Sequence, residues 1–146
     1  MPERVTERSI PIMSGYSRTH LAKKLSLKDG HRVLWHAMPQ HVQDEINSYG
    51  LELTPVQGGD EIDAAHIFVT ETSELAALIA ELRSHIAQNG MIWVSWPKKA
   101  SKRPTDITED TIRELALSTG LVDVKVCAID EVWSGLKLMI RKELRR

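Results

Sequence analysis

The chain has 146 residues, of which 42% are hydrophobic and 27% charged, and its formal net charge is −1 at pH 7. This length predicts one domain with a substantial core, and the composition excludes disordered and fibrous proteins. The balanced charge argues against general binding to nucleic acid or to an anionic membrane, because such binding needs a basic surface.

The terminal segment and the cysteine content indicate a compartment. The single cysteine, Cys127, cannot form an internal disulfide, which is typical of a reducing environment. The N-terminal stretch MPERVTERSIPIM lacks the apolar core of a secretory signal, and no stretch approaches the roughly 20 apolar residues of a membrane span. We therefore expect a cytoplasmic protein with no membrane partner. Residues 1–14 are expected to form a flexible arm, and residues 15–146 a single domain.

The domain opens with a short helix, which Ser17 can cap and which runs to about Leu25. The turn signal KDG at 28–30 ends this helix, and a strand is predicted within 31–38. A second helix is predicted over 40–49, because its apolar residues recur at spacings of three and four.

The middle of the chain adds two strands and the most regular helix. LELTPV at 51–56 predicts a short strand, and Pro55 favours an edge position because it has no N–H to donate. The apolar run at 64–71 predicts a central strand. Ser73 can cap the next helix, and Asn89-Gly90 is expected to close it.

The last third of the chain predicts a strand, a helix and a hairpin. MIWVSW at 91–96 has the pattern of a buried strand, and residues 106–109 (DITE) match a capping box for a helix to Thr119. The segments 121–130 and 136–142 alternate apolar and polar residues on either side of the turn EVWSG. They therefore predict an antiparallel hairpin.

This order of elements predicts a three-layer, Rossmann-like α/β fold. Helical crossovers make most strands parallel, and the expected sheet has about six strands in the order 2-1-3-4-6-5, with a C-terminal antiparallel hairpin. The layout resembles a shortened class I S-adenosylmethionine methyltransferase, a fold that also ends in an antiparallel hairpin.

Three segments also carry a resemblance to one family. GYSRTHLAKKLSLKDGHRV, WVSWPKKASK and LVDVKVCAIDEVWSGLKL resemble, in this order, small bacterial proteins classed as a domain of unknown function. The resemblance covers most of residues 14–141. It implies a Rossmann-like fold and a cytoplasmic bacterial source, and it implies no particular activity.

The functional residues are expected at one edge of the sheet. Ligands of such sheets bind outside the carboxyl ends of the parallel strands, where the segments GYS, SWPKKAS and EVWSG should meet. Lysines there would supply charge, hydroxyls orientation and tryptophans stacking. The predicted ligand-binding residues are Tyr16, Ser17, Trp96, Lys98, Lys99, Ser101, Trp133 and Ser134.

These residues favour a small anionic or planar ligand, and the leading expectation is a non-catalytic binding or regulatory module. Lys98 and Lys99 precede a predicted helix start at about Asp106, where free N–H groups favour an anion. The alternative for these lysines, and for Lys102 and Arg103, is a solvated surface with weak ion pairs.

Two other functions stay open. A divergent methyltransferase-like transferase would use the same edge, but the first turn, HAMPQHV, has no glycine and LELTPV ends in Val56 rather than an acid. Both departures disfavour S-adenosylmethionine, so no cofactor is expected. Nucleic-acid binding would use the basic loop and RKELRR at 141–146, and the acidic segments DITED and AIDE oppose it.

The six histidines do not predict a metal site. His36 and His41 flank a strand–helix turn without a metal-ligand spacing, and His66 is expected at the opposite edge of the sheet. Ser17 and Ser134 lack the G-x-S-x-G context of a nucleophile, so no catalytic residue is predicted. The edge strands leave a homodimer open.

Overall fold

The computed structural model describes residues 19–146, so the predictions for residues 1–14, Tyr16 and Ser17 lie outside it. Its strands are β2 (Arg32–His36), β3 (Thr54–Pro55), β4 (Ile62–Phe68), β5 (Ile86–Pro97), β6 (Leu121–Ala128) and β7 (Trp133–Ile140). Its helices are α1 (Leu21–Lys24), α2 (Gln40–Asn47), α3 (Thr72–Arg83) and α4 (Glu109–Ser118), with short 3-10 turns η1 (Lys99–Ser101) and η2 (Lys142–Leu144).

The six strands form one sheet in the order β3-β2-β4-β5-β7-β6. The strands β3, β2, β4 and β5 are parallel, whereas β7 is antiparallel to both β5 and β6. This is the order predicted from the sequence, including the C-terminal hairpin. The predicted α/β fold with three layers is confirmed.

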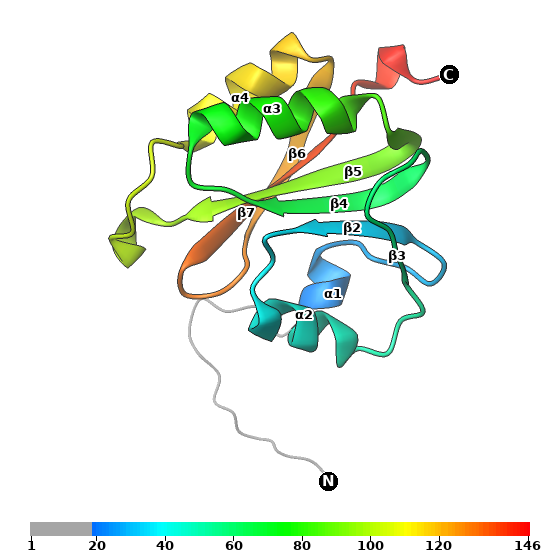
Figure 1. Ribbon diagram of the computed structural model, residues 1–146, viewed down its shortest axis with the longest axis horizontal. Coiled ribbons are helices and arrows are strands. Elements are labelled where there is room, and N and C mark those ends of the chain that lie inside the picture. Colours follow the sequence, from blue (N-terminus) through cyan, green and yellow to red (C-terminus); the bar gives the residue numbers. More distant parts are fainter. Residues whose placement is uncertain (1–18) are drawn as a thin grey trace, which may run out of the picture.

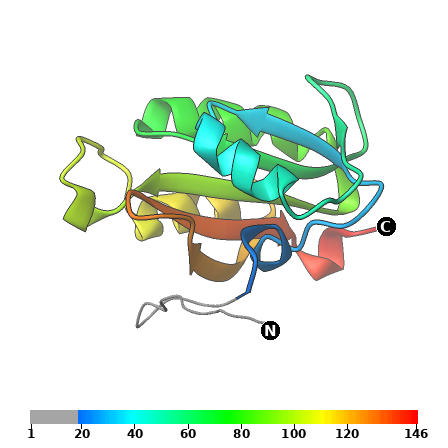
Figure 2. The same cartoon turned by 90° about the horizontal axis from the view of Figure 1, so that it is seen from below.

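The sheet separates two hydrophobic cores, because its central strands are apolar on both faces. Helices α3 and α4 cover one face and α1 and α2 the other, as Figure 1 shows and Figure 2 repeats from below. The first core joins Ile67 and Ile92 of the sheet to Leu75 of α3, and the second joins Trp93 to Val42 of α2. Burial of this kind contributes about 25 cal/mol per Å² of apolar surface, so both faces stabilise the sheet.

The boundary between α3 and β5 differs from the prediction. Helix α3 ends at Arg83, and β5 begins at Ile86 and runs through Asn89-Gly90, where a helix end was expected. Gly90 lies at an irregularity in the pairing of β4 with β5, and a Cβ there would lie 2.7 Å from the carbonyl oxygen of Ile62. The glycine is therefore needed for close backbone approach inside a strand, not for a helix stop.

The starts of the helices also depart from the predicted caps. Helix α1 begins after His20, whose Nδ1 accepts a hydrogen bond from the N–H of Ala22 at 3.0 Å. At the start of α3, Ser73 makes no cap, and the carboxylate of Asp106 accepts the N–H of Thr72 at 2.7 Å. A residue 34 positions away thus does what a local cap was expected to do.

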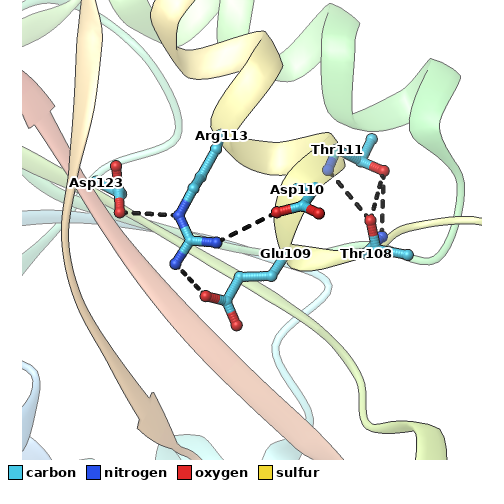
Figure 3. Close-up of polar contacts among 6 residues, drawn as sticks. All are labelled: Thr108, Glu109, Asp110, Thr111, Arg113 and Asp123. Carbon is cyan, nitrogen blue, oxygen red and sulfur yellow. Dashed lines mark hydrogen bonds and ion pairs between the residues drawn. The ribbon is translucent and has the colours of Figure 1, made fainter.

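Helix α4 starts at Glu109, later than predicted, with Thr108 as its N-cap. The hydroxyl of Thr108 accepts the N–H of Thr111, whose own hydroxyl accepts the N–H of Thr108 (Figure 3). The guanidinium of Arg113, in the next turn of α4, donates to Glu109 of the same helix. It also donates to Asp123 of β6 at 3.0 Å (Figure 3). Hydrogen bonds to these two acids raise the pKa of Arg113, and they hold α4 against β6.

Within residues 19–146, no helix is long and apolar enough to cross a membrane.

Candidate functional site at the carboxyl edge of the sheet

Two of the three predicted segments meet at the carboxyl edge. The end of β5 pairs with the start of β7, with Pro97 opposite Trp133, and the N–H of Lys98 donates to the carbonyl of Val132 at 2.7 Å. The convergence of SWPKKAS with EVWSG is confirmed, because the parallel strands and the hairpin turn share this edge. Tyr16 and Ser17 of the third segment lie outside the described residues.

The two tryptophans of this edge lie on opposite faces of the sheet. Trp96 pairs with Ser134, so Trp133, one residue away, points to the other face. Trp96 is 8% exposed within the core under α3 and α4. Trp133 is half-buried on the α1 and α2 face, where its ring meets the ring of Phe68 edge-on with centroids 5.1 Å apart. The two rings therefore face different cores, and the stacking of either ring on a ligand stays a prediction.

The basic loop after β5 folds on itself. The hydroxyl of Ser101 donates to the carbonyl of Lys98 at 2.7 Å and accepts the N–H of Arg103 at 3.3 Å. Lys99 is exposed and Lys98 is half-buried. The helix start expected at about Asp106 lies at Glu109, and the carboxylate of Asp106 instead caps α3. The role of Lys98 and Lys99 as anion ligands stays a prediction.

A cavity of about 390 Å³ opens at this edge on the Trp133 side, and we call it the rim crevice. It lies between the start of α2, the loop after β5 and the hairpin turn. Its lining residues are Pro39, His41, Arg103, Asp130, Glu131, Val132 and Trp133. Of the predicted ligand-binding residues within 19–146, Trp133 alone lines it.

An ordered pair of side chains forms the polar wall of the rim crevice. Nε2 of His41 lies 2.8 Å from Oδ2 of Asp130, and Oδ1 of Asp130 accepts the N–H groups of Val132 and Trp133 at 2.8 Å each. Burial alone would raise the pKa of Asp130, but the hydrogen bonds from His41 and the two N–H groups outweigh it and lower that pKa. Asp130 is thus a fixed, ionised carboxylate that orients the ring of His41.

Sequence reasoning missed this pair. His41 and Asp130 are 89 positions apart, and neither belongs to a local motif. The available signal was topological, because the turn after the first strand and the turn between the last two both lie at the carboxyl edge.

The turn from β2 to α2 has an unusual backbone. Ala37 has φ of +56°, in the left-handed region where non-glycine residues are strained by roughly 1–2 kcal/mol. The turn therefore has the backbone that glycine favours although it contains no glycine. Strain of this kind concentrates at functional sites, and Ala37 lies two residues before Pro39 of the rim crevice.

A second cavity of about 310 Å³ adjoins the rim crevice through Asp130 and Glu131. Thr19, Leu21 and Lys24 line it from the chain around α1. Ser17 and Tyr16 precede Thr19 by two and three residues, and their proposed part in a ligand site stays a prediction.

The histidines take other positions than a metal site would need. His66 lies inside the central strand β4 and is 1% exposed, so its expected place at the opposite edge was wrong. His36 makes an exposed contact with Glu74 at 3.0 Å. Among residues 19–146, no group of three or more His, Cys, Asp or Glu side chains could hold a metal ion.

Solved structures share this fold at low sequence identity. A Sulfolobus solfataricus protein described as a type 11 methyltransferase has a TM-score of 0.63 at 11% identity, over 87% of this chain and 93% of that one. Magnesium protoporphyrin IX methyltransferase from Synechocystis PCC 6803, with bound S-adenosylmethionine, has 0.55 at 16%, over 82% and 74%. LepI, in complex with S-adenosylmethionine, has 0.51 at 12%, over 83% of this chain and only 39% of LepI. These likenesses show a Rossmann-like, methyltransferase-like fold.

The sequence itself matches one family. No curated protein matches it. Residues 22–142 match DUF3052, a family described as a protein of unknown function. This span contains all six strands and every residue that lines the rim crevice. The chain therefore belongs to the DUF3052 family.

Proposed function

We propose that the protein is a small-ligand-binding module whose ligand occupies the rim crevice. The observation that carries the proposal is the half-buried ring of Trp133 beside the hydrogen-bonded pair of His41 and Asp130. Trp133 and Pro39 offer flat apolar surfaces for stacking. Arg103 offers donors. Nδ1 of His41 offers an acceptor, because Nε2 of the same ring donates to Asp130, and Glu131 adds another acceptor.

This lining favours a planar, polar ring that carries both donors and acceptors, such as a purine. A cavity of about 390 Å³ is within the range of small-molecule sites. Its place outside the carboxyl ends of the parallel strands is where sheets of this kind bind ligands. Arg103 would bind an anionic substituent on that ring. The proposed ligand is therefore planar and can also be anionic, as expected from the sequence.

The test is calorimetric titration with adenosine, S-adenosylmethionine and S-adenosylhomocysteine. We expect saturable heat for at least one of them, and about tenfold weaker binding after Trp133→Leu, since stacking of one base on an aromatic ring contributes about 1–3 kcal/mol. Arg103→Gln should weaken the binding of S-adenosylmethionine and S-adenosylhomocysteine, whose carboxylate Arg103 can bind, more than that of adenosine. Its matched control is Lys102→Gln, a neighbouring exposed cation that does not line the crevice. Absence of heat with every probe would refute a planar-ligand site.

A second candidate is a methyltransferase-like transferase at the same crevice. It is favoured by the left-handed backbone of Ala37 and by neighbours of the same fold that were solved with S-adenosylmethionine. In such a reaction the methyl group leaves the sulfonium sulfur, which keeps the electron pair, and bonds to an acceptor oxygen or nitrogen. The acceptor's proton would pass to His41, which Asp130 orients.

Turnover separates the two candidates. A transferase would convert S-adenosylmethionine to S-adenosylhomocysteine in the presence of small hydroxyl or amine acceptors, and His41→Gln would reduce the rate by about 10²-fold or more while leaving binding nearly unchanged. Binding without turnover would leave the non-catalytic module as the function.

A further inference from the structure

A third cavity, at the other end of the sheet, has a different chemistry. It has a volume of about 320 Å³ and lies on the α1 side, where β2 and β4 begin and β7 passes its midpoint. We call it the basic pocket. Its lining residues are Ser26, Lys28, His31, Asp63, Asn89, Met91, Lys137 and Met139.

Like charges lie side by side at this pocket. Lys125 of β6 is directly opposite Lys137 of β7 in the antiparallel register, and both side chains point to the α1 face. Directly opposed like charges destabilise a pair of strands. Lys28 and Lys137 both line the pocket, and Lys125 adds a third cation beside Lys137 just outside the lining. A bound anion would turn this repulsion into attraction.

Lys137 is half-buried at this pocket. Its Nζ donates to the hydroxyl of Ser26, in the turn after α1, at 3.2 Å. Burial, and then the nearby charges of Lys125 and Lys28, lower the pKa of Lys137. Within residues 19–146, no ion pair joins Lys28, Lys125 or Lys137 to an acid.

The neutral polar groups of the pocket add donors. Nδ1 of His31 accepts the N–H of Lys28 at 3.2 Å, so the neutral ring of His31 carries its proton on Nε2. The one carboxylate, Asp63, already accepts the N–H of Arg32 at 2.9 Å. Asn89 supplies a side-chain amide. Donors therefore outnumber acceptors in the lining.

The floor of the pocket is apolar. Met91 is 4% exposed and Met139 is half-buried, and both belong to or pack against the core on this face. From the cavity, the gathered cations and this floor, we propose that the basic pocket binds a small organic anion. Its phosphate or carboxylate group contacts Lys28 and Lys137, and its apolar part contacts Met91 and Met139. This site is separate from the rim crevice and does not depend on it.

The test follows the methionine methyl groups by NMR during titration of the full chain with phenyl phosphate, phenylacetate and neutral benzyl alcohol. We expect saturable shifts of Met91 and Met139 with an anion, and no shift of Met38, which is buried near α2. A tighter phenyl phosphate complex assigns a phosphate ligand, and a tighter phenylacetate complex a carboxylate. Shifts of equal size with benzyl alcohol would overturn the proposal.

Two substitutions test the cations. Lys137→Gln and Lys28→Gln should each weaken the anion about tenfold, the loss expected for one charge-assisted hydrogen bond. Lys28 is exposed, so Lys28→Gln tests the site even if Lys137→Gln disturbs the fold. Lys102→Gln, an exposed cation outside this pocket, is the matched control and should change nothing. Unchanged affinity in both test variants, or no saturable shift with either anion, would contradict an anion site.

Discussion

His66 shows how a single buried group makes stability depend on pH. Its Nε2 lies 2.7 Å from the hydroxyl of Ser95, its Nδ1 has no hydrogen-bond partner, and its ring stacks on Phe68 with centroids 4.6 Å apart. Complete burial lowers the pKa of His66 from 6.5 to about 3. The side chain is therefore neutral at physiological pH, which suits a core position and not the metal ligand or proton carrier that a histidine can be.

The first prediction follows from the sign of that shift. Below pH 6.5 the unfolded chain takes up a proton that folded His66 does not accept until pH about 3. Folding stability should thus fall as pH decreases across this window, by about 5 kcal/mol in total. Urea unfolding at neutral pH and at about pH 4 measures most of this fall.

A variant isolates the contribution of this histidine. His66→Phe keeps a ring but cannot titrate, so it should lose most of the difference in unfolding free energy between the two pH values. His36→Gln removes a histidine whose side chain is 34% exposed, and should keep that difference. Equal pH dependence in His66→Phe and the wild type would show that other groups cause it.

Ala37 gives a second prediction at the scale of one residue. Its φ of +56° is costly for alanine and free for glycine, so Ala37→Gly should stabilise the protein by about 0.5–1 kcal/mol even though glycine is more flexible when unfolded. Ala77→Gly, at an exposed position inside α3, should instead cost about 1 kcal/mol. Chemical unfolding of both variants checks the contrast, and destabilisation by Ala37→Gly would argue against strain in this turn.

At the scale of elements, the start of α3 depends on a residue outside it. The carboxylate of Asp106 accepts both the N–H and the hydroxyl of Thr72, at 2.7 and 3.0 Å. Asp106→Ala should lower the free energy of unfolding by about 1 kcal/mol, the usual value of an N-cap. Glu71→Ala is the control, because Glu71 precedes the same helix without a capping hydrogen bond. If both variants lost the same free energy of unfolding, the negative charge near the helix start, and not the capping hydrogen bond, would be the source of the stabilisation.

The irregular pairing of β4 with β5 depends on Gly90. A methyl group there would lie 2.7 Å from the carbonyl oxygen of Ile62, and backbone cannot move aside easily. Gly90→Ala should therefore destabilise the protein by about 2 kcal/mol or more. Gly58→Ala introduces the same group into open space and should change stability by less than about 0.5 kcal/mol. A tolerated Gly90→Ala would mean that the two strands can separate at this point.

At the scale of the whole molecule, the order of the sheet was predictable because each strand and helix has its own period of apolar residues. The end of α3 could not be predicted, because Ile86 fits both the apolar stripe of a helix and a strand. In addition, Asn89-Gly90 has the composition of a turn. Trp133 was placed correctly at the carboxyl edge. Trp96 was also placed correctly at this edge, but its face of the sheet was not predictable, because a shift of one position along a strand reverses the face. The contact of His41 with Asp130 was not predicted, because only the topology of the sheet brings these two distant residues together.

The hairpin gives a prediction for the molecule as a whole. Strand β7 pairs with β5 and contributes Leu136 and Leu138 to the core, each 0% exposed. A chain that stops after residue 128 should therefore lose cooperative unfolding and aggregate, because β5 would have an open, apolar edge. A chain that stops after residue 141 lacks only η2 and the residues after it, and should unfold cooperatively. Thermal melts followed by circular dichroism distinguish the two.

The position of β7 between β5 and β6 also determines when the molecule can close. Strand β7 is an inner strand of the sheet, but the ribosome synthesises it after both of its neighbours, β5 and β6. Strand β7 supplies Trp133 to the rim crevice and Lys137 and Met139 to the basic pocket. Both cavities are therefore complete only after this last strand has joined the sheet.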